Sequence, residues 1–188
     1  MITEYFDLPI LDWIRQNLQC AFLDGLMPAI TRLGDAGAIW IALALVLLCF
    51  PKWRKTGLTT ALALGIGLLL CNLTLKPLVG RIRPYDYQLQ HFGRVIQLLI
   101  AAPSDYSFPS GHTIASFEAA TVLLIGSRKW GIIAMVLAAL IAFSRLYLYV
   151  HYPTDVLTSV ALGIGIALLA NRLVSKGDSL LKDKKNHI

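Results

Sequence analysis

Five long apolar runs constrain the fold of this chain more than any other feature. They cover residues 35–51, 57–76, 109–126, 131–150 and 154–174. A helix crosses the hydrocarbon core of a bilayer with about 20 mostly apolar residues, so each run is a candidate membrane span. Only 15% of the residues are charged, whereas soluble domains carry about 25%. The sequence predicts an all-α polytopic transmembrane bundle of about five spans, with one membrane-embedded domain over residues 1–188.

The N-terminal segment, residues 1–34, does not have the pattern of a span. Its apolar residues alternate with charged ones such as Asp7, Asp12 and Arg15. This pattern predicts an amphipathic helix at the membrane interface, followed by a second short one over residues 24–33. The first residues are acidic rather than basic, so no cleaved signal peptide is expected.

The basic residues predict how the chain is oriented. Ten Lys and Arg residues fall in the turns at 52–55 and 128–129 and in the stretch from Arg172 onward. Positively charged loops stay in the cytoplasm, so these segments, including the tail 175–188, are predicted to be cytoplasmic. The N-terminal segment is then outside. Because much of the net charge of +6 sets topology and meets anionic lipid, no nucleic-acid partner is expected.

Three polar clusters interrupt the apolar pattern. They occupy residues 76–84, 109–112 and 144–155. Charged groups within a membrane protein are costly, so they point to a function. A five-span topology brings all three clusters to the outer surface, where we expect them to form one site.

The clusters supply the groups that a tetrahedral dianion needs. Lys76, Arg83 and Arg145 are cations, and Arg is suited to bidentate contacts with oxyanions. Ser110 and Gly111 open a helix, whose free N–H groups and dipole favour an anion. The pattern therefore predicts a phosphate pocket.

Two histidines complete the predicted chemistry. His151 precedes Asp155 by four residues, so the carboxylate can fix one imidazole nitrogen and leave the other free to attack. His112 lies beside the predicted pocket and is placed to protonate a leaving oxygen. This arrangement predicts phosphoryl transfer through a phosphohistidine and then attack by water, with the cations stabilising the equatorial oxygens. No carboxylate cluster suits Mg²⁺, and no metal or cofactor is expected.

These motifs resemble the type 2 phosphatidic acid phosphatase superfamily, whose pattern is KxxxxxxRP, then PSGH, then SRxxxxxHxxxD. The three clusters match every fixed position in the same order. The resemblance implies metal-independent hydrolysis with His151 as nucleophile, Asp155 as its partner and His112 as general acid. The phosphate ligands that it implies are Lys76, Arg83, Ser110, Gly111 and Arg145.

The expected function is dephosphorylation of a lipid phosphate or pyrophosphate in a bacterial inner membrane, with the active site facing outside. The short N-terminal segment resembles small bacterial enzymes that act on undecaprenyl pyrophosphate or phosphatidylglycerol phosphate. Undecaprenyl pyrophosphate, giving the monophosphate, is the first candidate substrate; phosphatidylglycerophosphate or phosphatidate is the alternative. A lipid phosphotransferase would need a second lipid site, a transporter would show internal repeats, and an inactive scaffold would lack a histidine. Membrane lipids are further expected partners, and the sequence indicates no oligomeric state.

Several residues near the motifs have less defined roles. Arg81 is interpreted as a solvated or headgroup contact, with a catalytic role as the alternative. Asp105 is interpreted as a residue that shapes the loop after the second run. Glu118 is either a supporting partner of the site or a protonated packing residue. A short interfacial helix is expected at residues 95–101. We interpret Tyr147, Tyr149 and Tyr152 as an aromatic belt at the membrane interface, with stacking on the substrate as the alternative.

Overall fold

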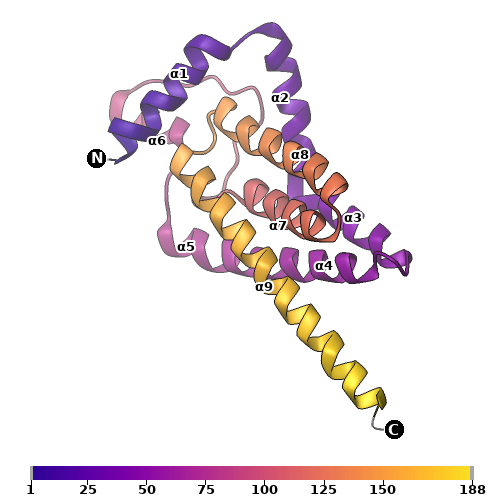
Figure 1. Cartoon of the computed structure of the whole chain (residues 1–188). Coiled ribbons are helices and arrows are strands. Elements are labelled where there is room, and N and C mark those ends of the chain that lie inside the picture. Colours follow the sequence, from indigo (N-terminus) through magenta and orange to yellow (C-terminus); the bar gives the residue numbers. More distant parts are fainter. Residues whose placement is uncertain (1, 187–188) are drawn as a thin grey trace.

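The computed structural model describes the backbone of residues 2–186 and the side chains of residues 2–180 (Figure 1). Within that part of the chain the regular structure is helical, without strands. In chain order the α-helices are α1 (Leu8–Leu18), α2 (Ala21–Leu33), α3 (Ala38–Cys49), α4 (Arg54–Leu68), α5 (Lys76–Val79), α6 (Pro84–Phe92), α7 (Gly111–Gly126), α8 (Arg128–Tyr147) and α9 (Pro153–Asn186). Shorter helical turns cover Thr3–Asp7, Asp35–Gly37 and Leu69–Leu75.

Each of the five apolar runs forms a helix, and the all-α membrane bundle is confirmed. Three stretches are long and apolar enough to cross a membrane, namely Arg54–Phe92, Arg128–Tyr147 and Pro153–Leu180. A fourth is reached if α2 and α3, which meet at a 42° bend, count as one broken span. The 16 residues of α7 fall short of the ~20 that a full span needs. By length the described helices give three or four crossings rather than five.

Helix α7 lies at the centre of the bundle. It packs against α8, α9 and α4 (Figure 1), and its Ala119 and Ala120 are completely buried. Small residues at such contacts let helix backbones approach closely, as in other membrane bundles. Because three helices surround α7, packing fixes the position of its first turn, which carries Gly111 and His112.

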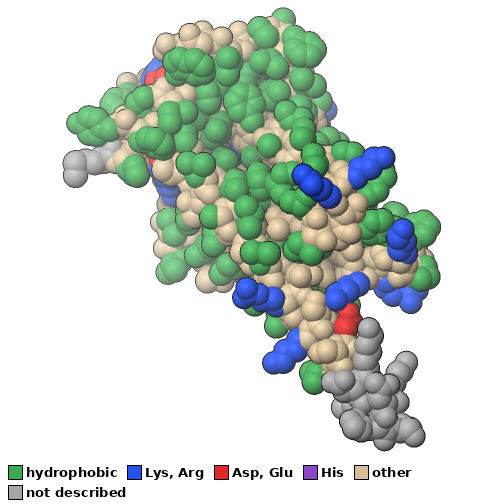
Figure 2. All heavy atoms as spheres, in the orientation of Figure 1, with side chains coloured by type: hydrophobic (Ala, Val, Ile, Leu, Met, Phe, Trp, Pro, Cys, Tyr) green, Lys and Arg blue, Asp and Glu red, His purple; other side chains and the backbone are tan. Residues whose placement is uncertain are grey.

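Basic side chains gather at one end of the bundle. Figure 2 shows Lys and Arg side chains around the end from which α9 projects, while hydrophobic side chains cover much of the rest of this face. The turn at 52–55 is tied to α9 by an ion pair of 3.3 Å between Lys55 and Asp178. Gly126, just before the second basic turn, packs against Thr56. The segments predicted to share the cytoplasmic side therefore lie near one another.

The N-terminal segment is helical, as predicted, and one face of it packs on the bundle. Leu8, Leu11 and Ile14 follow one another at helical spacing and are buried, in contact with the turn after α8. Trp13 and Phe6 are exposed. The amphipathic pattern is thus explained by packing on protein, and contact of the exposed face with the membrane interface stays a prediction.

The predicted helix at residues 95–101 is wrong. A helix forms earlier, as α6, with Pro84 in its first turn and Gly93 (φ 63°) at its end, an order that favours helix initiation and termination. Ile96 and Leu98 both pack against apolar clusters on the N-terminal helices. Side chains two positions apart point to the same side in an extended chain but not in a helix. Because Ile96 and Leu98 face the same clusters, this segment is extended rather than helical.

Helix α9 continues beyond the predicted fifth span. The apolar run ends near residue 174, but the helix extends to Asn186, so most of the predicted tail is helical. Residues 187–188 lie outside the described part, and the side of the membrane on which the tail lies stays a prediction.

Candidate active site

The three polar clusters meet at a cavity of about 850 Å³. Six of the eight residues predicted for the site line it, namely Lys76, Arg83, Gly111, His112, Arg145 and His151. The other two, Ser110 and Asp155, are fully buried beside these lining residues. Sequence motifs that lie up to 79 residues apart are therefore neighbours, as the predicted topology requires.

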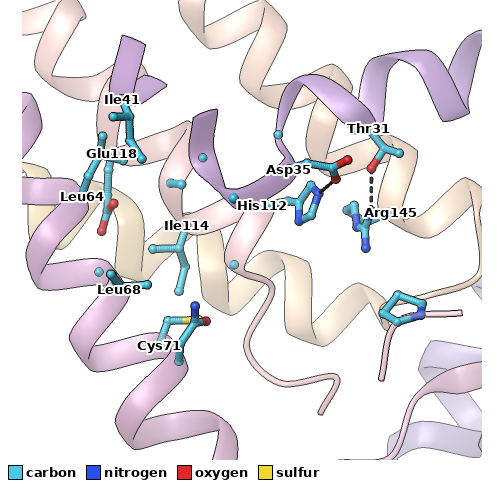
Figure 3. Close-up of a pocket in the computed structure, with 18 of the residues that line it drawn as sticks. Thr31, Asp35, Ile41, Leu64, Leu68, Cys71, His112, Ile114, Glu118 and Arg145 are labelled. Carbon is cyan, nitrogen blue, oxygen red and sulfur yellow. Dashed lines mark hydrogen bonds and ion pairs between the residues drawn. The ribbon is translucent and has the colours of Figure 1, made fainter. Parts of the chain in front are cut away.

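The cavity continues from this charged end into an apolar arm, which consists of Ile41, Leu64, Leu68 and Ile114. Figure 3 shows these side chains on one side of the view, and His112 with Arg145 on the other. Ile41 and Leu68 are about half exposed, so the arm reaches the surface of the bundle. A cationic end joined to an apolar arm fits a molecule with an anionic head and an apolar chain.

His151 and Asp155 are buried together at the charged end. His151 lies in the turn between α8 and α9, and Asp155 lies in the first turn of α9. His151 Nδ1 is 3.6 Å from Asp155 Oδ2, and His151 Nε2 is 3.4 Å from Arg83 Nη1. Two further donors fix the Asp155 carboxylate. Ser107 Oγ donates to it at 2.5 Å, and the N–H of Tyr152 donates to it at 3.1 Å.

The surroundings keep the His151 imidazole uncharged. Burial lowers the pKa of His151 to about 3, although the nearby Asp155 carboxylate acts in the opposite direction. The guanidinium groups of Arg145 and Arg83 add to the lowering. At neutral pH the ring therefore has a nitrogen lone pair available for attack.

Arg83 is fixed in place by a set of acceptors. Its Nε and Nη1 donate to the carbonyls of Asp105 and Val150 at 2.7 and 2.6 Å, and its Nη2 donates to Asp105 Oδ1 at 2.6 Å. Lys76, which is also buried, forms an ion pair with the other oxygen of Asp105. One carboxylate thus joins the two cations that were predicted to bind phosphate.

Asp105 has a larger role than the predicted shaping of its loop. Burial alone would raise the pKa of its carboxyl, but hydrogen bonds and charges from Lys76 and Arg83 lower it to about 2. Asp105 is therefore ionised and stands as an internal anion among the cations of the cavity. The sequence did not reveal this role, because Asp105 lies far from Lys76 along the chain.

Arg145 is buried rather than extended toward the surface. Its side chain donates from Nη1 to Thr31 Oγ1 at 2.5 Å (Figure 3). Its Nε has no hydrogen-bond partner among the described residues. A buried, unpaired N–H beside the cavity is a free donor for an oxyanion.

His112 has a partner that the sequence did not reveal. Its Nε2 lies 2.8 Å from Asp35 Oδ1 (Figure 3). Asp35 stands in the bend between α2 and α3, where Ala36 and Gly37 have positive φ angles. Gly34 allows the approach, because a Cβ there would lie 2.7 Å from the imidazole Cδ2 of His112. No motif in the sequence marks Asp35.

The helix start at Ser110 is only partly free for an anion. The N–H of Ser110 donates to Ser159 Oγ at 2.8 Å, and its hydroxyl accepts from Thr113 at 2.9 Å. Ser110 is not among the cavity-lining residues, whereas Gly111 is. First-turn N–H groups of a helix have no intrahelical acceptor, so the donors at this end begin at Gly111.

The interpretation of Arg81 as a solvated or headgroup contact is wrong. Its guanidinium forms ion pairs with Asp7 at 2.7 Å and Asp155 at 2.5 Å. It also lies 3.8 Å from the centre of the Tyr152 ring. Arg81 belongs to the group that holds Asp155, and sequence reasoning missed it because Asp7 is 74 residues away.

The aromatic-belt interpretation is wrong for the three tyrosines of this turn. All of Tyr147, Tyr149 and Tyr152 are 1–2% exposed. The hydroxyl of Tyr147 donates to Asp24 at 2.6 Å and that of Tyr149 donates to Asp12 at 2.8 Å. They anchor the N-terminal helices to the turn that carries His151.

Glu118 is buried in the apolar arm without a polar partner. It is 1% exposed, and its Oε1 has no hydrogen bond among the described residues. Its side chain lines the same cavity as Leu64 (Figure 3). Its carboxyl occupies space left by Gly67, where any side chain would collide with it. Of the two earlier interpretations, a packing position is favoured over a bonded partner of the site. Among residues 2–180, whose side chains are described, no group of three His, Cys, Asp or Glu could hold a metal ion.

A bundle of apolar helices around buried cations and histidines is the architecture of a membrane-embedded family. The sequence model of the PAP2 superfamily matches residues 55–178. This chain belongs to the PAP2 superfamily.

Named relatives cover nearly the whole chain. An undecaprenyl-diphosphatase of Sulfolobus acidocaldarius is 34% identical over 173 residues, which span 92% of this chain and 80% of the relative. LpxE of Aquifex aeolicus superposes with a TM-score of 0.76 at 27% identity, over 92% of this chain and 99% of that one. A PAP2 type phosphatidylglycerolphosphate phosphatase from Bacillus subtilis gives 0.70 at 28% identity, over 93% and 87%.

Proposed function

We propose that the protein is an integral-membrane lipid phosphate or pyrophosphate phosphatase with a histidine nucleophile. One observation carries this proposal. An uncharged His151, backed by Asp155, lines the same cavity as Lys76, Arg83 and Arg145. This combines a nucleophile with the cations that phosphoryl transfer requires.

In the first step, His151 Nε2 attacks the phosphorus and a nitrogen–phosphorus bond forms as the bond to the leaving oxygen breaks. Nδ1 faces Asp155, which stabilises the positive charge on the ring. Burial and the nearby Arg145 lower the pKa of His112 to about 4, against the effect of Asp35. We therefore propose that His112 takes up a proton together with the phosphate anion, whose charge offsets the cations of the cavity, and gives this proton to the leaving oxygen. Its Nδ1 is the nitrogen for this transfer, because Nε2 faces Asp35.

In the second step, water attacks the phosphohistidine. The now neutral His112 takes a proton from that water, the nitrogen–phosphorus bond breaks, and inorganic phosphate leaves with His151 restored. Lys76, Arg83, Arg145 and the N–H groups from Gly111 onward stabilise the equatorial oxygens in both steps. The same residues perform both halves without a metal, which makes metal independence part of the proposal.

Undecaprenyl pyrophosphate is the proposed substrate, hydrolysed to undecaprenyl phosphate and inorganic phosphate. The similarity to an undecaprenyl-diphosphatase over 92% of the chain supports it. Apart from Glu118, the side chains of the apolar arm suit a long lipid chain that has no polar groups. Because both histidines line the cavity, an inactive scaffold is not favoured.

Glu118 favours a second candidate substrate, phosphatidylglycerophosphate or phosphatidate. It lies six residues after His112, or about 9 Å along α7. A neutral carboxyl at that depth can bond to an ester or hydroxyl oxygen of a glycerolipid, whereas an isoprenoid chain offers no partner. The similarity to a phosphatidylglycerolphosphate phosphatase also supports this alternative.

The proposed location is a bacterial inner membrane, with the cavity toward the outside and the C-terminus in the cytoplasm. Support comes from α8, a candidate span that begins at the basic turn 128–129 and whose last turn carries Arg145, which lines the cavity. Excess Lys and Arg at the start of α8 favour the cytoplasmic side.

Phosphate release by the purified protein tests the proposed function. The substrates are undecaprenyl pyrophosphate, phosphatidylglycerophosphate and phosphatidate, each with and without EDTA. Wild-type protein is expected to release phosphate in EDTA, and His151→Ala to release none. Activity that survives in His151→Ala, or that EDTA abolishes, would contradict the mechanism.

A further inference from the structure

A buried chain of charges connects the N-terminal segment to the carboxylate behind His151. Arg81 Nη2 donates to Asp7 Oδ2 at 2.7 Å, and Arg81 Nη1 donates to Asp155 Oδ1 at 2.5 Å. Asp7 also accepts from the N–H and the hydroxyl of Thr154 at 2.9 and 2.8 Å. One guanidinium therefore bridges two carboxylates that are far apart in the sequence, one in the N-terminal segment and one in the first turn of α9.

These three charges are largely shut off from water. Asp7 and Asp155 have no exposed side-chain surface, and the Arg81 side chain is 19% exposed. The Tyr152 ring covers the guanidinium. Charges are weakly screened in such surroundings, and charge-assisted hydrogen bonds restrict the geometry of both partners. Asp7 lies outside residues 55–178, which match the superfamily, so the N-terminal segment adds this connection.

We propose that Asp7 is a positioning residue that acts through Arg81 to hold Asp155 against His151. The inference rests on the proposed phosphohistidine chemistry. Two carboxylates and one guanidinium together carry one net negative charge. That charge favours the positive charge that develops on His151 as its nitrogen bonds to phosphorus. Without Asp7, Arg81 would neutralise Asp155 and would lose the partner that fixes its own position.

The test compares two isosteric variants of the N-terminal segment in full-length protein. Asp7→Asn removes the charge that meets Arg81. Glu4→Gln is the matched control, because Glu4 is exposed and its carboxylate accepts from Tyr87 rather than from Arg81. Hydrolysis of undecaprenyl pyrophosphate and of phosphatidate is measured per folded enzyme, as judged by a monodisperse peak and thermal unfolding.

We expect Asp7→Asn to lower kcat about 10-fold with KM nearly unchanged, since misplaced catalytic groups affect rate more than binding. Glu4→Gln keeps the wild-type kcat and KM. In an Arg81→Gln background, Asp7→Asn has little further effect, because residues in one network are not additive. Asp7→Glu, which keeps the charge, recovers part of the rate.

Three results would overturn the inference. These are a wild-type kcat in Asp7→Asn, an equal loss in Glu4→Gln, or losses in Asp7→Asn and Arg81→Gln that multiply in the double variant. An active wild-type protein with an unchanged Asp7→Asn variant refutes the role of Asp7 alone. A wild-type protein that hydrolyses no lipid phosphate would overturn the proposed function and this inference with it.

Discussion

Asp35 Oδ1 lies 2.8 Å from His112 Nε2 and thereby joins the bend between α2 and α3 to the first turn of α7. The Asp35 side chain is 62% exposed, whereas that of His112 is mostly buried. The carboxylate is the anion that accompanies His112 when the imidazole is protonated. The bend before α3 therefore contributes to the proposed acid of the reaction.

Replacing Asp35 with Asn should slow the step in which the leaving oxygen is protonated. The amide keeps the shape but removes the charge that favours protonated His112, so we expect kcat at pH 7 to fall about 10-fold. Steady-state hydrolysis of undecaprenyl pyrophosphate measures this. A substrate with a good leaving group, such as p-nitrophenyl phosphate, should show a smaller loss. Equal losses on both substrates would contradict the assigned role.

The lowered pKa of His151 predicts how stability depends on pH. The folded-state pKa is about 3, against about 6.5 in an unfolded chain. Between these values the unfolded state binds the extra proton, so this group's contribution is lost as the pH falls from about 6.5 toward 3. The free energy of unfolding in detergent should drop more steeply with falling pH in wild type than in His151→Gln. Parallel curves would show that His151 is not buried in its neutral form.

Asp105→Asn should make the cavity bind free anions more tightly. The carboxylate of Asp105 pairs with Lys76 and Arg83, so an incoming phosphate has to replace it or share its partners. We expect the inhibition constant of inorganic phosphate to fall several-fold, roughly 3- to 10-fold, since buried charges without a partner are costly. Asp86→Asn, in the nearby α6, is the control. Weaker inhibition by phosphate would instead indicate that Asp105 holds the cations in their binding positions.

Glu118→Leu should change the preference between lipid classes. The variant removes the one carboxyl of the apolar arm, so kcat/KM for phosphatidate should fall about 10-fold relative to undecaprenyl pyrophosphate, as expected for one lost hydrogen bond in a buried site. Glu118→Gln keeps hydrogen-bonding capacity and should stay close to wild type. Comparison of diacyl, ether-linked and lyso forms of phosphatidate separates an ester partner from a hydroxyl. An unchanged ratio would assign Glu118 to packing alone.

Most of the fold and of the cavity lining could be predicted because the signals are local. Apolar runs specify helices wherever they occur, and His151 with Asp155 forms one short motif between two of them. The helix expected at 95–101 was wrong because Ile96 and Leu98 are held extended by contacts with distant helices. Pattern alone does not report such contacts.

The residues that support the site were hidden for a related reason. Arg81 has its partners at Asp7 and Asp155, and a loop arginine looks the same whether it meets water or a buried carboxylate. The tyrosines at the end of α8 have the pattern of an interfacial belt, yet Tyr147 and Tyr149 donate to Asp24 and Asp12. Buried polar pairing between distant segments leaves no periodic trace in the sequence.

The central claim is that phosphate is carried on His151, and trapping the phosphoenzyme tests it most directly. Enzyme is mixed with a substrate radiolabelled in the terminal phosphate, quenched in alkali and analysed by peptide mapping. We expect an alkali-stable, acid-labile label on His151 in wild type, more label in His112→Ala where hydrolysis is slowed, and none in His151→Ala. A fully active wild-type enzyme that never acquires label, or label that persists in His151→Ala, would contradict this claim.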